Sequence, residues 1–207
     1  MSFQSYKDMN SEALDMLREI SSIGTSHAAS ALSKFLHKEI RIDLPVVEVL
    51  EHSAAVKAIG NGDEEKSVGA TLVRMTGEIE GIVLFLYDMT FANNVLNALL
   101  NETHDSFEEM TDIDISALNE VGNIIICAYI NALSKLLGED IQLSVPGFTL
   151  NMLGAVLTVP MVEYGYETNE VMYSNADFIM EGEHLSAWLL MMPDIESLNK
   201  ITRKLGL

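Results

Sequence analysis

Hydrophobic residues recur along the chain at the three-to-four-residue spacing of helices that bury one face. Two of these stretches are long. One follows the cap candidate Asn10, and the other runs to Gly138, a residue type that commonly ends helices. Two shorter stretches show the same spacing. The pattern predicts four helices, at about residues 12–37, 90–101, 112–138 and 194–205.

Between these helices lie six stretches of the β-branched and apolar composition that is typical of strands. They are Ile40 to Val49, Ser67 to Met75, Ile79 to Tyr87, Ile141 to Asn151, Val171 to Met180 and Leu185 to Met191. The segment Met152 to Tyr166 fits a strand or a helix, and we leave it open. Because most strands are joined by short connections without a helix, an antiparallel sheet is expected. The predicted fold class is α+β, with a six-stranded antiparallel sheet and two long helices packed on one face.

The sequence also repeats itself. The stretch that begins at Glu19 aligns without a gap on the stretch that begins at Glu120, at a constant offset of 101 residues. Both stretches contain Ala-Leu-Ser-Lys, at 31–34 and at 132–135. A weaker match at an offset of 105 joins a strand and the following helix of each half. An internal duplication of the fold is therefore expected.

This repeat defines the expected domain organisation. We expect a single domain over residues 1–207, made of two repeats at about 11–101 and 110–207 that share one sheet. The polar stretch from Asn101 to Glu109 is the expected linker between the halves. The two long helices then occupy equivalent places in the two repeats.

Charge and composition narrow the class of partner. The formal net charge is −19, from 31 acidic and 12 basic residues, which opposes binding to nucleic acid and to anionic lipid. The first ten residues are polar and lack a secretory signal pattern, and no stretch approaches the roughly 18 uninterrupted apolar residues of a membrane span. We therefore expect a cytoplasmic protein that binds neither nucleic acid nor membrane.

Few residues carry recognisable chemistry. The single cysteine, Cys127, lies in an apolar run, so no intramolecular disulfide can form and the residue is interpreted as a buried small hydrophobe. Phosphate-binding loops, nucleophile elbows and paired Cys-x-x-Cys motifs are missing. The five histidines are scattered without ligand spacing, so no metal site is predicted.

One pair of polar residues stands out because its place is repeated. Glu120 and Asn123 are three residues apart on a predicted helix, so their side chains share one face. Glu19 and Ser22 occupy the equivalent places in the first helix. Apolar core positions flank both pairs, which puts them at the border between buried face and solvent. By themselves the pairs fit ordinary surface polar residues as well as a partner-binding site.

The two long helices resemble a known family. The segment Leu17 to Ser33, which contains Glu-Ile-Ser-Ser, and the segment Leu118 to Ile124, which contains Glu-Val-Gly-Asn, are similar to the two site-bearing helices of the CheC/CheX/FliY family of chemotaxis phosphatases. The resemblance extends over the whole chain, and its length and paired helices are closer to CheC than to the shorter CheX. It implies a pseudo-twofold α+β domain whose long helices carry the sites.

The resemblance implies a phosphatase that acts on the phospho-aspartate of a CheY-type response regulator. In such an enzyme the asparagine orients the attacking water and the glutamate pairs with a lysine of the regulator, and these roles fall to Asn123 and Glu120. No cofactor is expected on this chain, since Mg²⁺ would belong to the regulator. Where the family has asparagine the first helix has Ser22, so the Glu19 and Ser22 pair is expected to be a degenerate second site with a docking role at most.

Two other functions stay open. A CheC-like chain could act as a non-enzymatic binding module, either as an adaptor for the receptor deamidase CheD or as a scaffold like the flagellar switch proteins. An unrelated α+β ligand-binding domain would require the repeat and both helix matches to be coincidental. The complete Glu-x-x-Asn pair favours the phosphatase.

Overall fold

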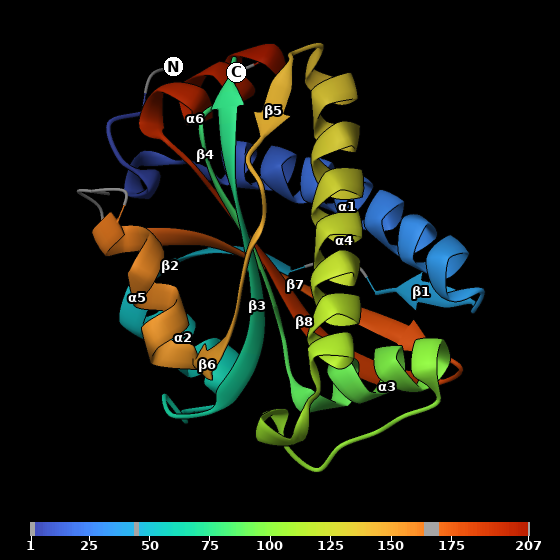
Figure 1. The fold of residues 1–207 in the computed structure, drawn as a ribbon. Helices are drawn as coiled ribbons and strands as arrows, with labels where there is room; N and C mark the ends of the chain where they lie inside the picture. The colour runs from blue at the N-terminus through green and yellow to red at the C-terminus, as the bar shows by residue number, and fades with distance from the viewer. Residues whose placement is uncertain (1–2, 44–45, 164–169, 207) are drawn as a thin grey trace.

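The computed structural model describes residues 3–43, 46–163 and 170–206, which form one antiparallel sheet with helices on both faces (Figure 1). The strands are β1 (Ile40–Ile42), β2 (Val46–Glu51), β3 (Ser67–Gly77), β4 (Gly81–Tyr87), β5 (Ile141–Leu143), β6 (Gly147–Met152), β7 (Glu170–Met180) and β8 (Glu183–Pro193). The helices are α1 (Ser11–Leu36), α2 (His52–Gly60), α3 (Met89–Leu100), α4 (Asp112–Leu137), α5 (Leu153–Glu163) and α6 (Ile195–Lys204). Two short 3₁₀ helices, η1 (Tyr6–Asp8) and η2 (Phe107–Glu109), precede the long helices.

The sheet has eight strands in six positions. Its order is β1-β7-β8-β4-β3-β5, while β2 also pairs with β7 and β6 also pairs with β3. The predicted strands Ile40 to Val49 and Ile141 to Asn151 are therefore each divided into two shorter strands. In the second case the division falls at 144–146, where Pro146 has no N–H to donate to the ladder. The antiparallel six-position sheet is confirmed, and the division of its outer strands is new.

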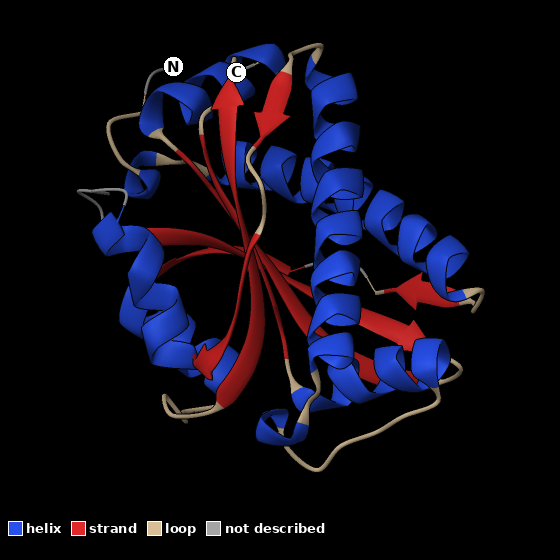
Figure 2. Cartoon of the chain, viewed as in Figure 1, coloured by secondary structure: helices blue, strands red, loops and turns tan. Residues whose placement is uncertain are grey.

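Alternation along the strands creates two hydrophobic cores, one on each face of the sheet. On β4, Val83, Phe85 and Tyr87 belong to one core, and Ile82, Leu84 and Leu86 belong to the other. Helices α1, α3, α4 and α6 cover the first core, and α2 and α5 cover the second (Figure 2). The sheet is thus a middle layer buried on both sides.

The predicted long helices are confirmed to within one residue at each end, as are the positions of α3 and α6. Helix α2 was not predicted. It is only nine residues long, so its apolar positions repeat over too few turns to show a helical pattern. The open segment Met152 to Tyr166 forms the end of β6 and α5, and its residues from 164 onward lie outside the described part of the chain. Both additional helices cover the second face of the sheet, so the expectation of helices on one face was incomplete.

Exchanging the two halves leaves the sheet order unchanged, with β1 to β4 taking the places of β5 to β8. The ends of α1 and α4 also correspond. Asn10 and Thr111 both cap a helix N-terminus with their side chains, and the serines of the two Ala-Leu-Ser-Lys runs donate to backbone oxygens just beyond the C-termini. This likeness is what a duplication would produce; the duplication itself and its boundaries stay predictions.

An asparagine clamp fixes the segment before each long helix. Asn93 of α3 accepts a hydrogen bond from His104 N at 2.9 Å and donates one to His104 O at 2.8 Å. Asn199 of α6 makes the same two bonds to the backbone of Phe3, at 2.6 and 2.8 Å. Phe3 and His104 are themselves 101 residues apart in the sequence. The N-terminal segment is therefore held by the last helix (Figure 1).

Two glycines allow close approaches of the long helices. A Cβ at Gly122 of α4 would lie 2.1 Å from Thr71 Oγ1 of β3, and one at Gly24 of α1 would lie 2.5 Å from the ring of Tyr129 of α4. Only a residue without a side chain fits at such distances. Gly122 therefore sets how closely α4 lies against the sheet, and Gly24 sets how closely α1 crosses α4.

Within the described ranges, α4 is the one helix that is long and apolar enough to cross a membrane by length and composition. The core helix of a soluble protein passes the same test. Here the apolar face of α4, including Leu118, Val121 and Ile125, is buried in the core. The expectation that the protein does not bind membranes stays a prediction.

Replacing Gly122 by alanine should destabilise the protein, because the added methyl group overlaps Thr71 on a buried strand. We expect Gly122→Ala to lower the free energy of unfolding by about 1–3 kcal/mol, the usual cost of overpacking. The measurement is equilibrium denaturation in urea. Gly154→Ala in α5 is the matched control, because its Cβ would meet Glu64 O at an ordinary 3.4 Å. Equal losses in the two variants would contradict a special close approach at Gly122.

Candidate functional site

Glu120 and Asn123 lie on the outer side of α4, one helical turn apart. Glu120 is exposed and Asn123 is half-buried. Between them, Val121 and Gly122 are buried and face the core and β3. The close contact of Gly122 with β3 thus lies within the same helical turn as the two polar side chains. This packing gives the pair a rigid support.

Glu19 and Ser22 hold the equivalent places on α1. Glu19 is exposed and Ser22 is half-buried, so the burial of the first pair matches that of the second. The backbone oxygen of Ser22 accepts hydrogen bonds from the hydroxyls of Thr25 and Ser26, at 3.1 and 2.8 Å. The two places differ in side-chain chemistry, because a serine hydroxyl is shorter than a carboxamide and lacks its fixed donor and acceptor.

The two helices that carry these pairs contact each other directly. Tyr129 of α4 packs on Gly24 of α1 and is fully buried. Burial raises the pKa of Tyr129 to about 12, and a hydrogen bond with Ser21 acts in the opposite direction. Since Ser21 adjoins Ser22, the crossing fixes the place of the first pair relative to the helix that carries the second.

Cys127 lies next to the second pair. Its Sγ donates a weak hydrogen bond to Asn123 Oδ1 at 3.4 Å. Burial, and in second place the negative charge of Glu120, raise the pKa of the Cys127 thiol. The sequence interpretation of a buried residue was too simple, because Cys127 is half-buried and contacts the candidate site. The thiol thus directly contacts the amide oxygen of Asn123.

An open hollow of about 490 Å³ adjoins Glu120. Three helices contribute to it: the C-terminal ends of α1 and α3 and the first turns of α4. Phe35, Leu100 and Ile113 are partly exposed there, and Ile113 is 68% exposed. Exposed apolar side chains gathered beside a polar pair are typical of a protein-binding surface.

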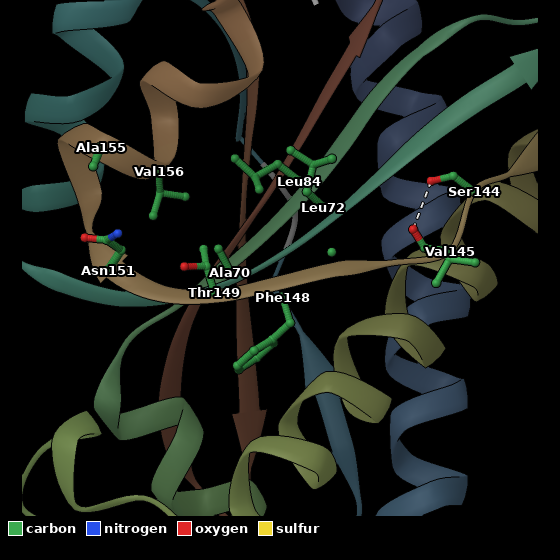
Figure 3. A pocket seen from close by; sticks show the side chains of 11 residues that line it. Ala70, Leu72, Leu84, Ser144, Val145, Phe148, Thr149, Asn151, Ala155 and Val156 are labelled. Carbon is green, nitrogen blue, oxygen red and sulfur yellow. Dashed lines mark hydrogen bonds between the residues drawn. The ribbon is translucent and has the colours of Figure 1, made fainter. Parts of the chain in front are cut away.

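A second hollow, of about 430 Å³, lies between β3, β6 and α5 (Figure 3). Ala70, Leu84 and Val156 line it and belong to the core on the second face of the sheet. None of its eleven lining residues is ionisable, and neither Glu120 nor Asn123 is among them. The lining of this hollow therefore offers no ionisable side chain for acid or base chemistry.

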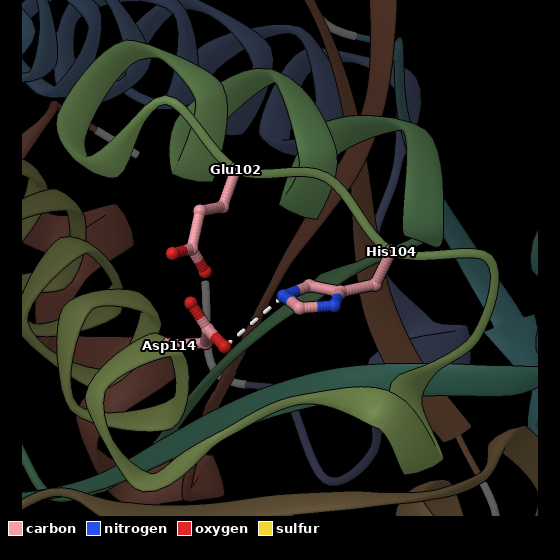
Figure 4. Close-up of side chains that lie close together, drawn as sticks. All are labelled: Glu102, His104 and Asp114. Atoms are coloured by element: carbon pink, nitrogen blue, oxygen red, sulfur yellow. Dashed lines mark ion pairs between the residues drawn. The ribbon is translucent and has the colours of Figure 1, made fainter.

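One group of possible metal ligands escaped the sequence analysis. Glu102, His104 and Asp114 bring one ligand atom each within 4.8 Å of the others (Figure 4). They lie on the connection between α3 and α4 and on the first turn of α4, so no regular spacing marks them. Only the capping pattern of Thr111 with Asp114 could have drawn attention to that turn.

The chain is similar to known chemotaxis and flagellar proteins in sequence and in fold. The family described as "Chemotaxis phosphatase CheX" matches residues 70–162. The chain is 27% identical to the CheY-P phosphatase CheC of Bacillus subtilis over 205 residues, which is 97% of each chain. Among solved structures, Thermotoga maritima FliY is similar with a TM-score of 0.77 and 22% identity, over 95% of this chain and 99% of that one.

A further similar structure is that of a CheX bound to CheY. The CheX–CheY–BeF₃–Mg²⁺ complex of Borrelia burgdorferi matches with a TM-score of 0.54 and 19% identity, over 82% of this chain and 94% of that one. At these identities the two solved structures establish the likeness of fold. The similarity in sequence to the CheC of B. subtilis extends over nearly the full length of both chains.

The charge of Glu120 should slow the reaction of Cys127 with alkylating reagents. The raised thiol pKa leaves less of the reactive thiolate at a given pH, so removing the neighbouring negative charge lowers that pKa and increases the thiolate. We expect Glu120→Gln to react faster with iodoacetamide at pH 8, followed by intact-mass spectrometry. Glu19→Gln, on the other helix, should keep the wild-type rate. An unchanged rate in Glu120→Gln would place the carboxylate too far away.

Proposed function

The chain belongs to the CheC/CheX/FliY family, and from that relationship we propose that it dephosphorylates the phospho-aspartate of a CheY-type response regulator. The relative in B. subtilis is named a CheY-P phosphatase, and a CheX has been solved together with CheY. The observation that carries the proposal is the Glu120 and Asn123 pair, held on the outer side of a helix that is seated on the sheet within the same turn.

In the proposed reaction, Asn123 orients a water molecule in line with the acyl phosphate and Glu120 pairs with a lysine of the regulator. Hydrolysis of an acyl phosphate requires little covalent chemistry from the enzyme, so positioning the water is a sufficient contribution. Mg²⁺ is supplied by the acidic pocket of the regulator, and this chain supplies no cofactor. The Cys127 bond to Asn123 Oδ1 supports this role, because it restricts rotation of the amide.

The hollow beside Glu120, which is lined by apolar side chains together with Asp112 and Ser116, supplies the docking contact in this proposal. The chain carries a net charge of −19, and the phosphorylated acidic pocket of the regulator is also anionic, so long-range electrostatics oppose the encounter. Binding must therefore come from short-range contacts. Ile113, Phe35 and Leu100 offer apolar surface at the right place, next to the one carboxylate that is proposed to pair with a lysine.

The two repeats divide the work unequally in this proposal. Glu19 remains able to pair with a regulator, but Ser22 is too short to hold the water where an asparagine would, so the first pair has a docking role at most. We further propose that the halves arose by duplication within one domain, that the protein acts in the cytoplasm, and that CheD is a possible second partner. The rival function, a binding module without catalysis, predicts that the wild-type chain does not speed phosphate release from the regulator.

Replacing Asn123 by alanine should abolish most of the phosphatase activity. Loss of the positioned water predicts a fall in rate of about 100-fold or more. The measurement is phosphate release from a CheY-type regulator charged with acetyl phosphate. Asn131→Ala, at an exposed position farther along α4, is the matched control and should keep full activity. Ser22→Asn should increase activity by restoring the first pair. Undiminished activity of Asn123→Ala would overturn the assignment.

Replacing the most exposed apolar side chain of the hollow by a charged one should weaken binding of the regulator more than it slows the chemical step. We expect Ile113→Asp to raise KM about tenfold, equivalent to losing one well-packed apolar contact, with little change in kcat. Leu136→Asp is the control, because Leu136 is 43% exposed on the same helix. It lies about 24 Å from Glu120 along the axis. Equal effects of the two substitutions would remove the hollow from the docking surface.

A further inference from the structure

We propose that Glu102, His104 and Asp114 form a binding site for a divalent transition-metal ion of the zinc class. The site is separate from the Glu120 and Asn123 pair and does not depend on the proposed phosphatase activity. It lies where the connection between the two halves meets the N-terminus of α4 (Figure 4). An imidazole with two carboxylates is a ligand set that suits zinc and its neighbours in the first transition row.

The buried carboxylate of Asp114 has one oxygen that is satisfied and one that is not. Its Oδ2 accepts hydrogen bonds from Thr111 N and Thr111 Oγ1, at 2.8 and 2.7 Å. Its Oδ1 is buried and has no hydrogen-bond partner in the described part of the chain, although the side chain is 0% exposed. Helix capping explains the first oxygen but not the second. An unpaired oxygen at such a position is costly unless something binds it.

His104 supplies the second ligand atom. Its Nε2 lies within ion-pair distance of Asp114 Oδ2, at 3.0 Å, and this carboxylate oxygen is the one described polar group near it. In Figure 4 this nitrogen points to the gap between the carboxylates of Glu102 and Asp114. His104 Nε2 therefore lies beside the same carboxylate whose other oxygen, Oδ1, has no described partner.

Glu102 completes the set from the exposed side. Its carboxylate faces that of Asp114 in Figure 4, and the three ligand atoms lie within 4.8 Å of one another. Two carboxylates brought together repel each other unless a proton or a cation lies between them. Because Glu102 is exposed and its side chain is flexible, it can close the remaining distance to an ion. A solvent molecule can fill the open coordination position.

The first half of the chain shows that the fold does not require polar residues at this place. At an offset of 101, His104 corresponds to Phe3 and Asp114 corresponds to Ala13, and both of these are buried apolar residues. The same clamp by an asparagine holds the backbone of Phe3 and of His104. A half-buried histidine and a buried aspartate therefore replace a pair that packs without any desolvation cost. Helix capping by Thr111 accounts for one oxygen of Asp114, and it leaves Oδ1 and the histidine without an explanation.

The test is titration of the chelator-treated full-length protein with zinc chloride, followed by isothermal calorimetry. We expect one ion to bind per chain and the thermal unfolding midpoint to rise with zinc. Co²⁺ in place of zinc should give the visible absorption of a site with nitrogen and oxygen ligands. His104→Phe combined with Asp114→Ala copies the packing of the first half and should abolish the site. Glu102→Gln should weaken binding about tenfold or more.

Surface histidines provide the control for nonspecific binding. His27 and His184 are exposed and far from this cluster in sequence, so His27→Gln and His184→Gln should leave the affinity unchanged. Wild-type binding no tighter than that of the double variant would overturn the proposal, as would an affinity that Glu102→Gln leaves unchanged. If the double variant does not fold, the exposed Glu102→Gln variant and its Co²⁺ spectrum decide the question.

Discussion

The rest of the structure depends on the close packing of α4 against β3. Gly122 has no side chain, and this lets the helix backbone come against Thr71 at a distance that any other residue would prevent. Thr71 Oγ1 is buried there without a described hydrogen-bond partner. The close contact therefore costs the free energy of desolvating this hydroxyl. Because Glu120 and Asn123 flank this glycine, the position of the candidate site follows directly from the fit between helix and sheet.

The same fit extends to the first half through the crossing of the two long helices. Tyr129 projects from α4 onto Gly24 of α1, so each helix is located by a glycine that faces a larger residue. At the place equivalent to Gly122, α1 has Ser21, which is buried and bonds to Tyr129. The halves therefore share a frame but use different local contacts. The two helices have the same length, but α4 packs on the sheet through a glycine where α1 has a buried serine.

The sequence predicted what depends on local periodicity and failed where tertiary contacts decide. The 26-residue helices were found because many turns repeat one apolar face, whereas α2, with nine residues, had too few turns to be recognised. The pair on α4 was found by its repeated position and by resemblance to a family. The hollow could not be predicted, since Phe35 and Ile113 meet only after α1 and α4 pack. Likewise, His104 and Asp114 come together because of the path of the loop before α4. The number of residues between them does not predict that path.

The paired asparagine clamps have a consequence for the way the chain is connected. Asn93 holds a segment that follows it closely in the sequence, whereas Asn199 holds Phe3, at the opposite end of the described chain. Each clamp thus joins the last helix of one half to the segment before the long helix of the other half. The two junctions pack alike, and they differ in that the backbone continues from α3 to η2 but not from α6 to Phe3. A circularly permuted chain, with a linker from α6 to Phe3 and a break between α3 and η2, would keep both hydrophobic cores and exchange the order of the two long helices.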